Sequence, residues 1–184
     1  MPEARLRALI QQDALRFQVL HKVRSLNLPD CWVAAGFVRN AVWDHLHGHA
    51  HSPLASDVDV IWFDPARCDR SLDQHLEALL HDGLPGIDWS VKNQARMHLR
   101  NADPPYASAT DAMRFWPETA TAVAVRLNET GHCEVAAPLG LDDLFGLVLR
   151  PTAGFAQAKR ALYDERLRAK TWHLRWPLLR YEPR

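Results

Sequence analysis

The feature that most constrains the fold of this sequence is the alternation of short apolar runs with segments of helical spacing over residues 31–92. Each run has the length of a β-strand and is bounded by Gly, Pro or Asp; the expected strands are Cys31–Ala35, Asp57–Phe63 and Ile87–Lys92. Apolar residues at helical spacing between them predict helices over Phe37–Leu46 and Ser71–His81, the latter capped by Ser71. This order predicts an α/β (α+β) fold, a mixed β-sheet with flanking helices.

The flanking segments extend this pattern. Helices are expected over Ala4–Ser25, Leu141–Leu147 and Ala153–Lys170, and strands over Ala120–Leu127 and Cys133–Ala136. The length of 184 residues suits one domain, 1–184, with a core at about 30–150 and a helical tail at 151–184 that packs back on it.

Composition excludes several classes of protein. The 22 basic and 22 acidic side chains balance, which argues against a non-specific nucleic-acid coat protein. No run approaches the roughly 18 apolar residues of a membrane span, and the first residues lack the apolar core of a secretory signal. Three cysteines without a CxxC pattern suit reduced thiols. We therefore expect a cytoplasmic protein without a membrane partner.

Two carboxylates, Asp57 and Asp59, begin the second expected strand. Residues two apart on a strand point to the same side, and adjacent carboxylates raise each other's pKa unless a cation lies between them. Mg²⁺ binds through one or two carboxylates together with phosphate oxygens of a substrate. The pair therefore suits a metal–nucleotide complex; the alternative is a solvated strand edge, which the apolar run 60–63 disfavours.

A glycine corner at Gly36 joins the first expected strand to the next helix. Glycine lets the main chain approach a ligand, and a helix N-terminus offers unpaired N–H groups to a phosphate, although most such glycines only make the turn. Asp88 lies on the third expected strand. Because neighbouring strands are about 4.8 Å apart, Asp88 is the candidate third carboxylate of a two-metal site.

Two motifs resemble a known superfamily. Ala35-Gly36-Phe37-Val38-Arg39-Asn40 is similar to the Gly-Gly-x-Val-Arg-Asp turn of poly(A) polymerases and CCA-adding enzymes, and Asp57-Val58-Asp59-Val60 to their Asp-x-Asp strand. The chain thus resembles the nucleotidyltransferase superfamily, with the DNA polymerase β-like fold. It looks closer still to a bacterial group of small nucleotidyltransferase-like proteins, through Ala35–Trp43, Asp57–Phe63, Val91–His98, Trp116–Ala120 and Ala137–Phe145.

The resemblance implies transfer of a nucleoside monophosphate from an NTP to an acceptor hydroxyl, with release of pyrophosphate. It implies that Asp57, Asp59 and Asp88 are catalytic and hold Mg²⁺ or Mn²⁺, with Asp88 activating the acceptor. Gly36 would contact the β- and γ-phosphates. The remaining candidates for nucleotide binding are Arg39, Lys92 and Arg96. Arg39 is a phosphate partner or, as we favour, an ion-pair anchor for its helix. Lys92 and Arg96 neutralise triphosphate charge or are simply solvated.

Other functions stay open at this point. The main alternative is a catalytically inactive nucleotide- or partner-binding domain that keeps the fold. A metal-dependent phosphohydrolase is disfavoured, because its aspartates usually end a strand, whereas Asp57 and Asp59 begin one. The histidines of 45–51 are interpreted as a solvated loop, with zinc as the minority view. The neutral charge favours a small acceptor over a nucleic acid.

Overall fold

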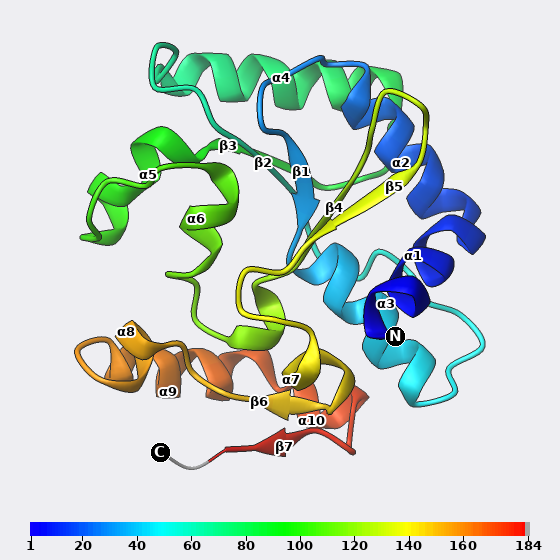
Figure 1. The fold of residues 1–184 in the computed structure, drawn as a ribbon, viewed down its shortest axis with the longest axis vertical. Helices are drawn as coiled ribbons and strands as arrows, with labels where there is room; N and C mark the ends of the chain where they lie inside the picture. The colour runs from blue at the N-terminus through cyan, green and yellow to red at the C-terminus, as the bar shows by residue number, and fades with distance from the viewer. Residues whose placement is uncertain (183–184) are drawn as a thin grey trace.

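The computed structural model describes residues 1–182 and is drawn in Figure 1. In chain order the elements are α1 (Pro2–Gln12), α2 (Ala14–Arg24), β1 (Trp32–Ala34), α3 (Gly36–Leu46), β2 (Val58–Trp62), α4 (Arg70–Gly83), β3 (Trp89–Asn93), α5 (Gln94–Asn101), α6 (Ala109–Met113), the 3₁₀-helix η1 (Thr119–Thr121), β4 (Ala124–Leu127), β5 (Cys133–Ala136), α7 (Asp142–Phe145), β6 (Val148–Leu149), α8 (Ala153–Ala156), α9 (Arg160–Lys170), α10 (Trp172–Arg175) and β7 (Arg180–Tyr181). None of the described helices is long and apolar enough to cross a membrane.

A five-stranded sheet of order β3-β2-β1-β4-β5 forms the centre of the molecule. Strands β2 and β3 are parallel, whereas β1 runs antiparallel to both β2 and β4, and β4 antiparallel to β5. The predicted mixed sheet with flanking helices is therefore confirmed. Near the C-terminus, β6 and β7 pair in parallel as a separate small sheet.

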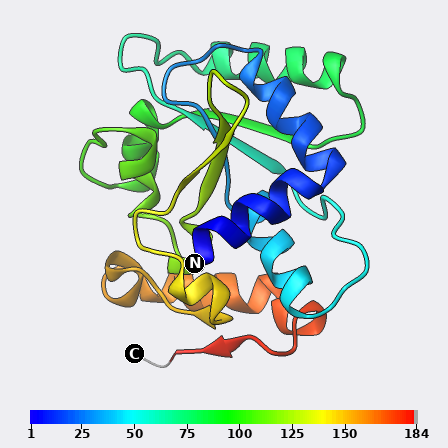
Figure 2. The same ribbon diagram turned by 45° about the vertical axis from the view of Figure 1, so that its right-hand side comes forward.

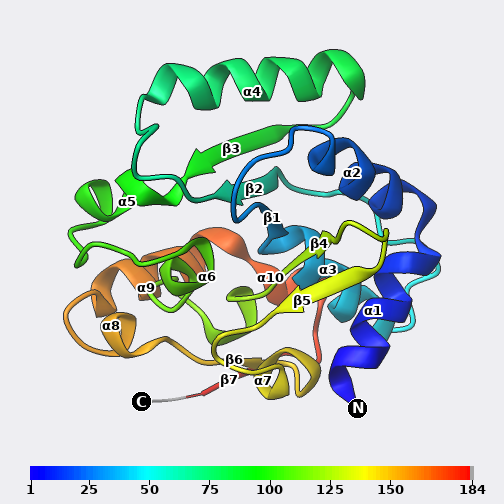
Figure 3. The same cartoon turned by 45° about the horizontal axis from the view of Figure 1, so that its top comes forward.

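The two faces of the sheet are covered unequally, because alternate residues of each strand point to opposite sides. One face, with Val33 and Val60, packs in the main core with α1 to α4. Figure 2 shows α1 and α2 crossing this side, and Figure 3 shows α4 alongside β3. The other face, with Trp32 and Ile61, packs against Met113 of the short α6. This thinner cover leaves part of the second face free for a site.

Several helix boundaries differ from the expected ones, and two of the differences have capping side chains as their cause. The expected helix Ala4–Ser25 is two helices, because Asp13 leaves the helical conformation and its side chain accepts a hydrogen bond from the Arg16 amide (2.9 Å). Helix α4 is capped by Asp69 rather than Ser71. The expected helix Ala153–Lys170 divides into α8 and α9, and the expected strand Ala120–Leu127 begins as η1. The sequence pattern predicts neither α5 nor α6.

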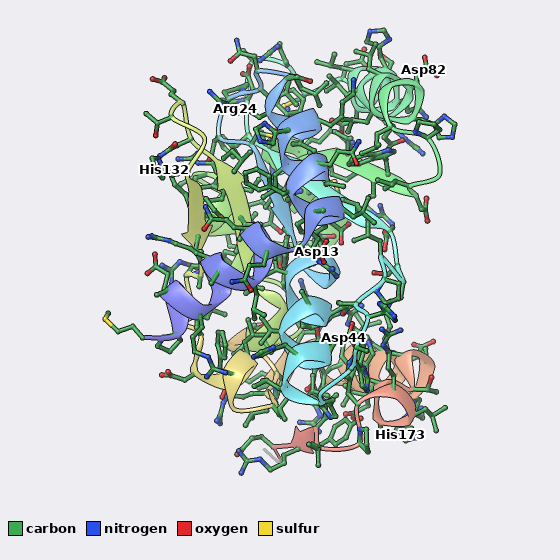
Figure 4. All side chains as sticks on the ribbon, turned by 90° about the vertical axis from the view of Figure 1, so that its right-hand side faces the viewer. Asp13, Arg24, Asp44, Asp82, His132 and His173 are labelled. Atoms are coloured by element: carbon green, nitrogen blue, oxygen red, sulfur yellow. The ribbon has the colours of Figure 1, made fainter. Side chains whose placement is uncertain are left out.

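The C-terminal tail packs back on the body, as predicted. Trp172 and Trp176 meet Trp43 of α3 edge to face, with ring centroids 5.5 and 5.1 Å apart. The buried Asp44 carboxylate accepts hydrogen bonds from the Trp176 indole (2.8 Å) and from Arg175 (3.0 and 3.1 Å). In Figure 4, Asp44 lies on the part of α3 near the segment that carries His173.

Two histidines of the 45–51 run take part in this docking. His49 Nδ1 lies 2.9 Å from Asp44 Oδ1, and His47 Nε2 accepts a hydrogen bond from the Leu178 amide (3.1 Å). Burial raises the pKa of Asp44, but hydrogen bonds from Ser52, His49, Trp176 and Arg175 outweigh burial and leave the pKa lowered. The expectation of a solvated loop is therefore wrong for His47, which contacts the tail, whereas His49 stays exposed and contacts Asp44.

Candidate active site

The two predicted carboxylates lie on the thinly covered face of the sheet. Asp59 of β2 stands directly opposite Ala34 of β1 on one side and Ser90 of β3 on the other. Asp57 directly precedes β2 and, two residues away, points to the same face. Asp57 is exposed and Asp59 is partly buried. Within residues 1–182, neither carboxylate accepts a hydrogen bond or forms an ion pair.

Burial and a neighbouring negative charge perturb the pKa of Asp59. Burial raises its pKa, the charge of Asp57 raises it further, and the more distant charges of Arg39, Lys92 and Lys170 lower it, leaving a pKa of about 6. The two carboxylates therefore have no direct counter-ion within residues 1–182, and a bound cation would relieve their repulsion.

The glycine corner lies against the carboxylate strand. A Cβ built on Gly36 would come within 2.8 Å of Ser56 Oγ, and Ser56 is the neighbour of Asp57. The first-turn amides of Gly36 and Phe37 donate no hydrogen bond to any described residue. Unpaired N–H groups and the positive end of the helix dipole favour an anion at this point.

Ala35 makes the corner possible at an energetic cost. Its φ of 54° and ψ of −122° form a conformation that side-chain-bearing residues rarely adopt. The resembling motif carries glycine here, so the Ala35 departure, although it keeps the corner, introduces backbone strain. The corner is otherwise held by the Ala35 amide, which donates to Val123 O (2.9 Å).

Asp88 lies near the pair but is not gathered into a cluster with it. Its main-chain oxygen accepts from the Val58 amide (2.7 Å), and Ile87 and Trp89 point into the main core. Alternation therefore directs the exposed Asp88 side chain to the face of Asp57 and Asp59. Among residues 1–182, however, no group of three or more His, Cys, Asp or Glu side chains is close enough to hold a metal ion.

Arg39 is buried, and within residues 1–182 it forms no ion pair, so the expected ion-pair anchor is replaced by hydrogen bonds and aromatic rings. Its Nη1 donates to Thr121 Oγ1 (2.8 Å) and its Nη2 to Asn40 Oδ1 (3.0 Å), and the guanidinium lies over the rings of Trp43 and Trp172. Burial lowers the pKa of Arg39 to about 10. Both terminal nitrogens are thus engaged inside the protein.

The other two predicted cations have carboxylate partners. Lys92 Nζ lies 2.7 Å from Glu77 Oε1 of α4, while its side chain still lines the site cavity. Arg96 is bound to the buried Asp73 of α4, which also accepts from Trp62. The structure therefore brings Lys92 to the site and holds Arg96 at α4.

A cavity of about 240 Å³ opens beside Asp59. Its other lining residues are Ala35, Ile61, Ser90, Lys92, Gln94, Met97, Asn101, Trp116, Pro117, Thr121 and Arg166. A larger cavity of about 580 Å³ lies at the opposite end of β1, and no predicted site residue lines it. Asp59 and Ala35 line this smaller cavity, whereas Gly36 and Asp57 lie together at the neighbouring corner. Asp88 lines a separate cavity of about 460 Å³.

The sequence reasoning missed Thr121, Glu118 and Arg166. Thr121 Oγ1 donates to the fully buried Glu118 (2.8 Å), and Arg166 binds the same carboxylate from α9. The sequence could have indicated Glu118, since residues 116–120 form one of the segments that resemble the nucleotidyltransferase-like group. It does not indicate Arg166, because this residue lies in an ordinary helix of mixed charge.

Comparison with known proteins agrees with this geometry. A family model described as nucleotidyltransferase matches residues 21–181. A solved protein described as a CCA-adding enzyme head domain is 34% identical with a TM-score of 0.86, and the match covers 97% of this chain and 95% of that one. None of the curated proteins matches the chain.

Full-length CCA-adding enzymes share the fold at lower identity. The Thermotoga maritima enzyme complexed with tRNA is 18% identical with a TM-score of 0.58, covering 98% of this chain and 42% of the enzyme. A CCA-adding enzyme in complex with CTP is 16% identical with a TM-score of 0.56, covering 97% and 41%. The chain thus spans about two fifths of these enzymes. With most of its length matched by the family model and a close relative over nearly its whole length, this chain belongs to the nucleotidyltransferase family.

Proposed function

We propose that this protein is a metal-dependent nucleotidyltransferase that transfers a nucleoside monophosphate from an NTP to an acceptor hydroxyl and releases pyrophosphate. The observation that carries the proposal is the unpartnered Asp57–Asp59 pair beside the N-terminus of α3, where the Gly36 and Phe37 amides donate no hydrogen bond to the described residues. A structural neighbour in complex with CTP supports an NTP as the substrate.

The carboxylate pair fits a divalent cation. Both side chains offer oxygen donors without protein partners in the described range, and burial together with the charge of Asp57 raises the pKa of Asp59. Such donors suit Mg²⁺ or Mn²⁺. When bound, the ion would screen the phosphate charges and lower the pKa of the acceptor hydroxyl.

The chain's own groups then divide the remaining work. The amides at Gly36 and Phe37 bind phosphate oxygens. Asp88 accepts the proton of the acceptor hydroxyl. The oxygen of that hydroxyl forms a bond to the α-phosphorus, and the bond between the α-phosphorus and the pyrophosphate oxygen breaks. Lys92 forms part of the cavity wall near the phosphates, and Arg96 positions α5 through Asp73.

The acceptor that we favour is a small molecule rather than RNA. The chain has a formal net charge of zero. Backbone contacts to a nucleic acid require several cationic side chains on one surface.

Thermal melts with each NTP and Mg²⁺ or Mn²⁺ test the binding step. We expect the wild type and the control Asp82→Asn, an exposed change on α4, to be stabilised. The double variant Asp57→Asn, Asp59→Asn should lose this stabilisation. An equal shift in the wild type and the double variant would remove the site assignment.

Pyrophosphate release with cell extract as the acceptor source tests the reaction. We expect Asp88→Asn to lower the rate at least about 100-fold, as for loss of a general base, while the nucleotide-dependent thermal shift persists. An unchanged rate would exclude the role of Asp88. Silence of the wild type with all NTPs and both metals, despite a thermal shift, would favour the inactive binding domain.

A further inference from the structure

Helix α9, from the C-terminal part of the chain, forms one wall of the cavity beside Asp59. Arg166 lines that cavity and is fixed by Glu118, with Nε 2.6 Å from Oε1 and Nη2 3.2 Å from Oε2. Its Nη1 donates no hydrogen bond within residues 1–182. Figure 1 shows α9 running below α6. A guanidinium fixed along one edge and open along another is prepared to bind an anion.

Lys170 follows Arg166 by four residues, so both lie on the same side of α9. Lys170 is exposed, and it has no ion pair or hydrogen bond with the described residues. Two other cations of this region are already engaged, Arg39 by Thr121 and Lys92 by Glu77.

We propose that Arg166 and Lys170 form a cationic wall that binds the phosphate chain of the nucleotide, so that the C-terminal segment completes the substrate site. This inference rests on the proposed function. An NTP bound only by a carboxylate pair would meet like charge, and the open amides of α3 offset that charge from one side. Arg166 supplies opposite charge from the wall of the cavity that Asp59 lines, and Lys170 lies one turn further along α9.

Binding of inorganic tripolyphosphate and of ATP, measured by calorimetry at fixed ionic strength, tests the wall. Tripolyphosphate carries the phosphate chain without base or ribose. Lys170→Ala is the informative variant because Lys170 is exposed and its loss leaves no buried charge. We expect it to weaken both ligands about tenfold, within the range for a hydrogen bond to a charged group, and Lys170→Arg to keep most of the affinity.

The matched control is Arg168→Ala, which removes the same charge from an exposed position two residues away, on another side of α9. We expect its affinity to stay within about twofold of the wild type, as for a surface change away from the site. Equal losses in Lys170→Ala and Arg168→Ala would reduce the effect to overall charge and overturn the proposal. An effect on ATP alone would also overturn it, because the wall would then contact base or ribose.

The outcomes separate this inference from the function beneath it. If the wild type binds neither ligand and Mg²⁺ with NTP gives no thermal shift, the proposed function and the wall fail together. If the wild type binds ATP and the shift depends on Asp57 and Asp59, but Lys170→Ala binds as tightly as the wild type, only the wall is wrong.

Discussion

Asp59→Asn is expected to stabilise the metal-free protein at neutral pH while it removes a ligand of the proposed metal. The pKa of Asp59 is about 6 in the folded protein, against 3.8 as the ordinary value, because burial and Asp57 disfavour its charge. A difference of about two pKa units corresponds to roughly 3 kcal/mol, because each pKa unit corresponds to about 1.36 kcal/mol. Because Asp59 is partly exposed to solvent, we expect the gain in unfolding free energy to be smaller, about 1–2 kcal/mol.

The direction follows from proton binding. Between pH 3.8 and about 6 the folded protein holds the Asp59 proton more tightly than the unfolded chain. The stability from this group is therefore complete below pH 3.8 and is lost as the pH rises through about 6. An asparagine side chain does not titrate in this range, so the Asp59→Asn variant should exceed the wild type in stability at about pH 8 and approach it at about pH 4.

Urea unfolding in EDTA from about pH 4 to about pH 8 measures this difference directly. Asp88→Asn, which removes an exposed carboxylate from the same face, is the control, and its stability should stay within about 0.5 kcal/mol of the wild type. Added Mg²⁺ should stabilise the wild type and leave Asp59→Asn unchanged. Wild type and Asp59→Asn curves that run parallel across the whole pH range would refute the reasoning.

Three further changes test the corner and the tail. Ala35→Gly should raise stability by about 1 kcal/mol, because it relieves a positive φ; a thermal melt higher by about 2–4 °C is expected, and a lower one would contradict the strain. Gly36→Ala should weaken ATP binding in calorimetry, because its Cβ would press on Ser56 Oγ at 2.8 Å; adding Ser56→Ala should restore the affinity, and failure of this rescue would count against the contact. Asp44→Ala should lose about 3–5 kcal/mol in urea unfolding, since it leaves the tail's buried partners unsatisfied; a loss below about 1 kcal/mol would show that the tail docks without this carboxylate.

The residue pattern was sufficient to predict those helices and strands that depend only on residues within the element. The strands around Val33, Val60 and Val91 follow from apolar runs bounded by turn residues, and helix α3 follows from its helical spacing. Asp57 and Asp59 share a face through strand alternation alone, which needs no knowledge of the rest of the chain. Even the missed break at Asp13 had a local cause, its capping side chain, that propensity and spacing did not weigh strongly enough.

Contacts between distant segments could be decided only by the tertiary structure. Whether Arg39 faces a ligand or the interior depends on Thr121 and Trp172. Thr121 lies 82 residues further along the chain, and Trp172 lies in the C-terminal tail. The position of Arg166 beside Asp59 depends on how α9 packs against a sheet formed much earlier in the chain. Sequence spacing fixes the direction of a side chain relative to its own element, whereas its neighbours, burial and pKa depend on which other elements the compact chain places against it.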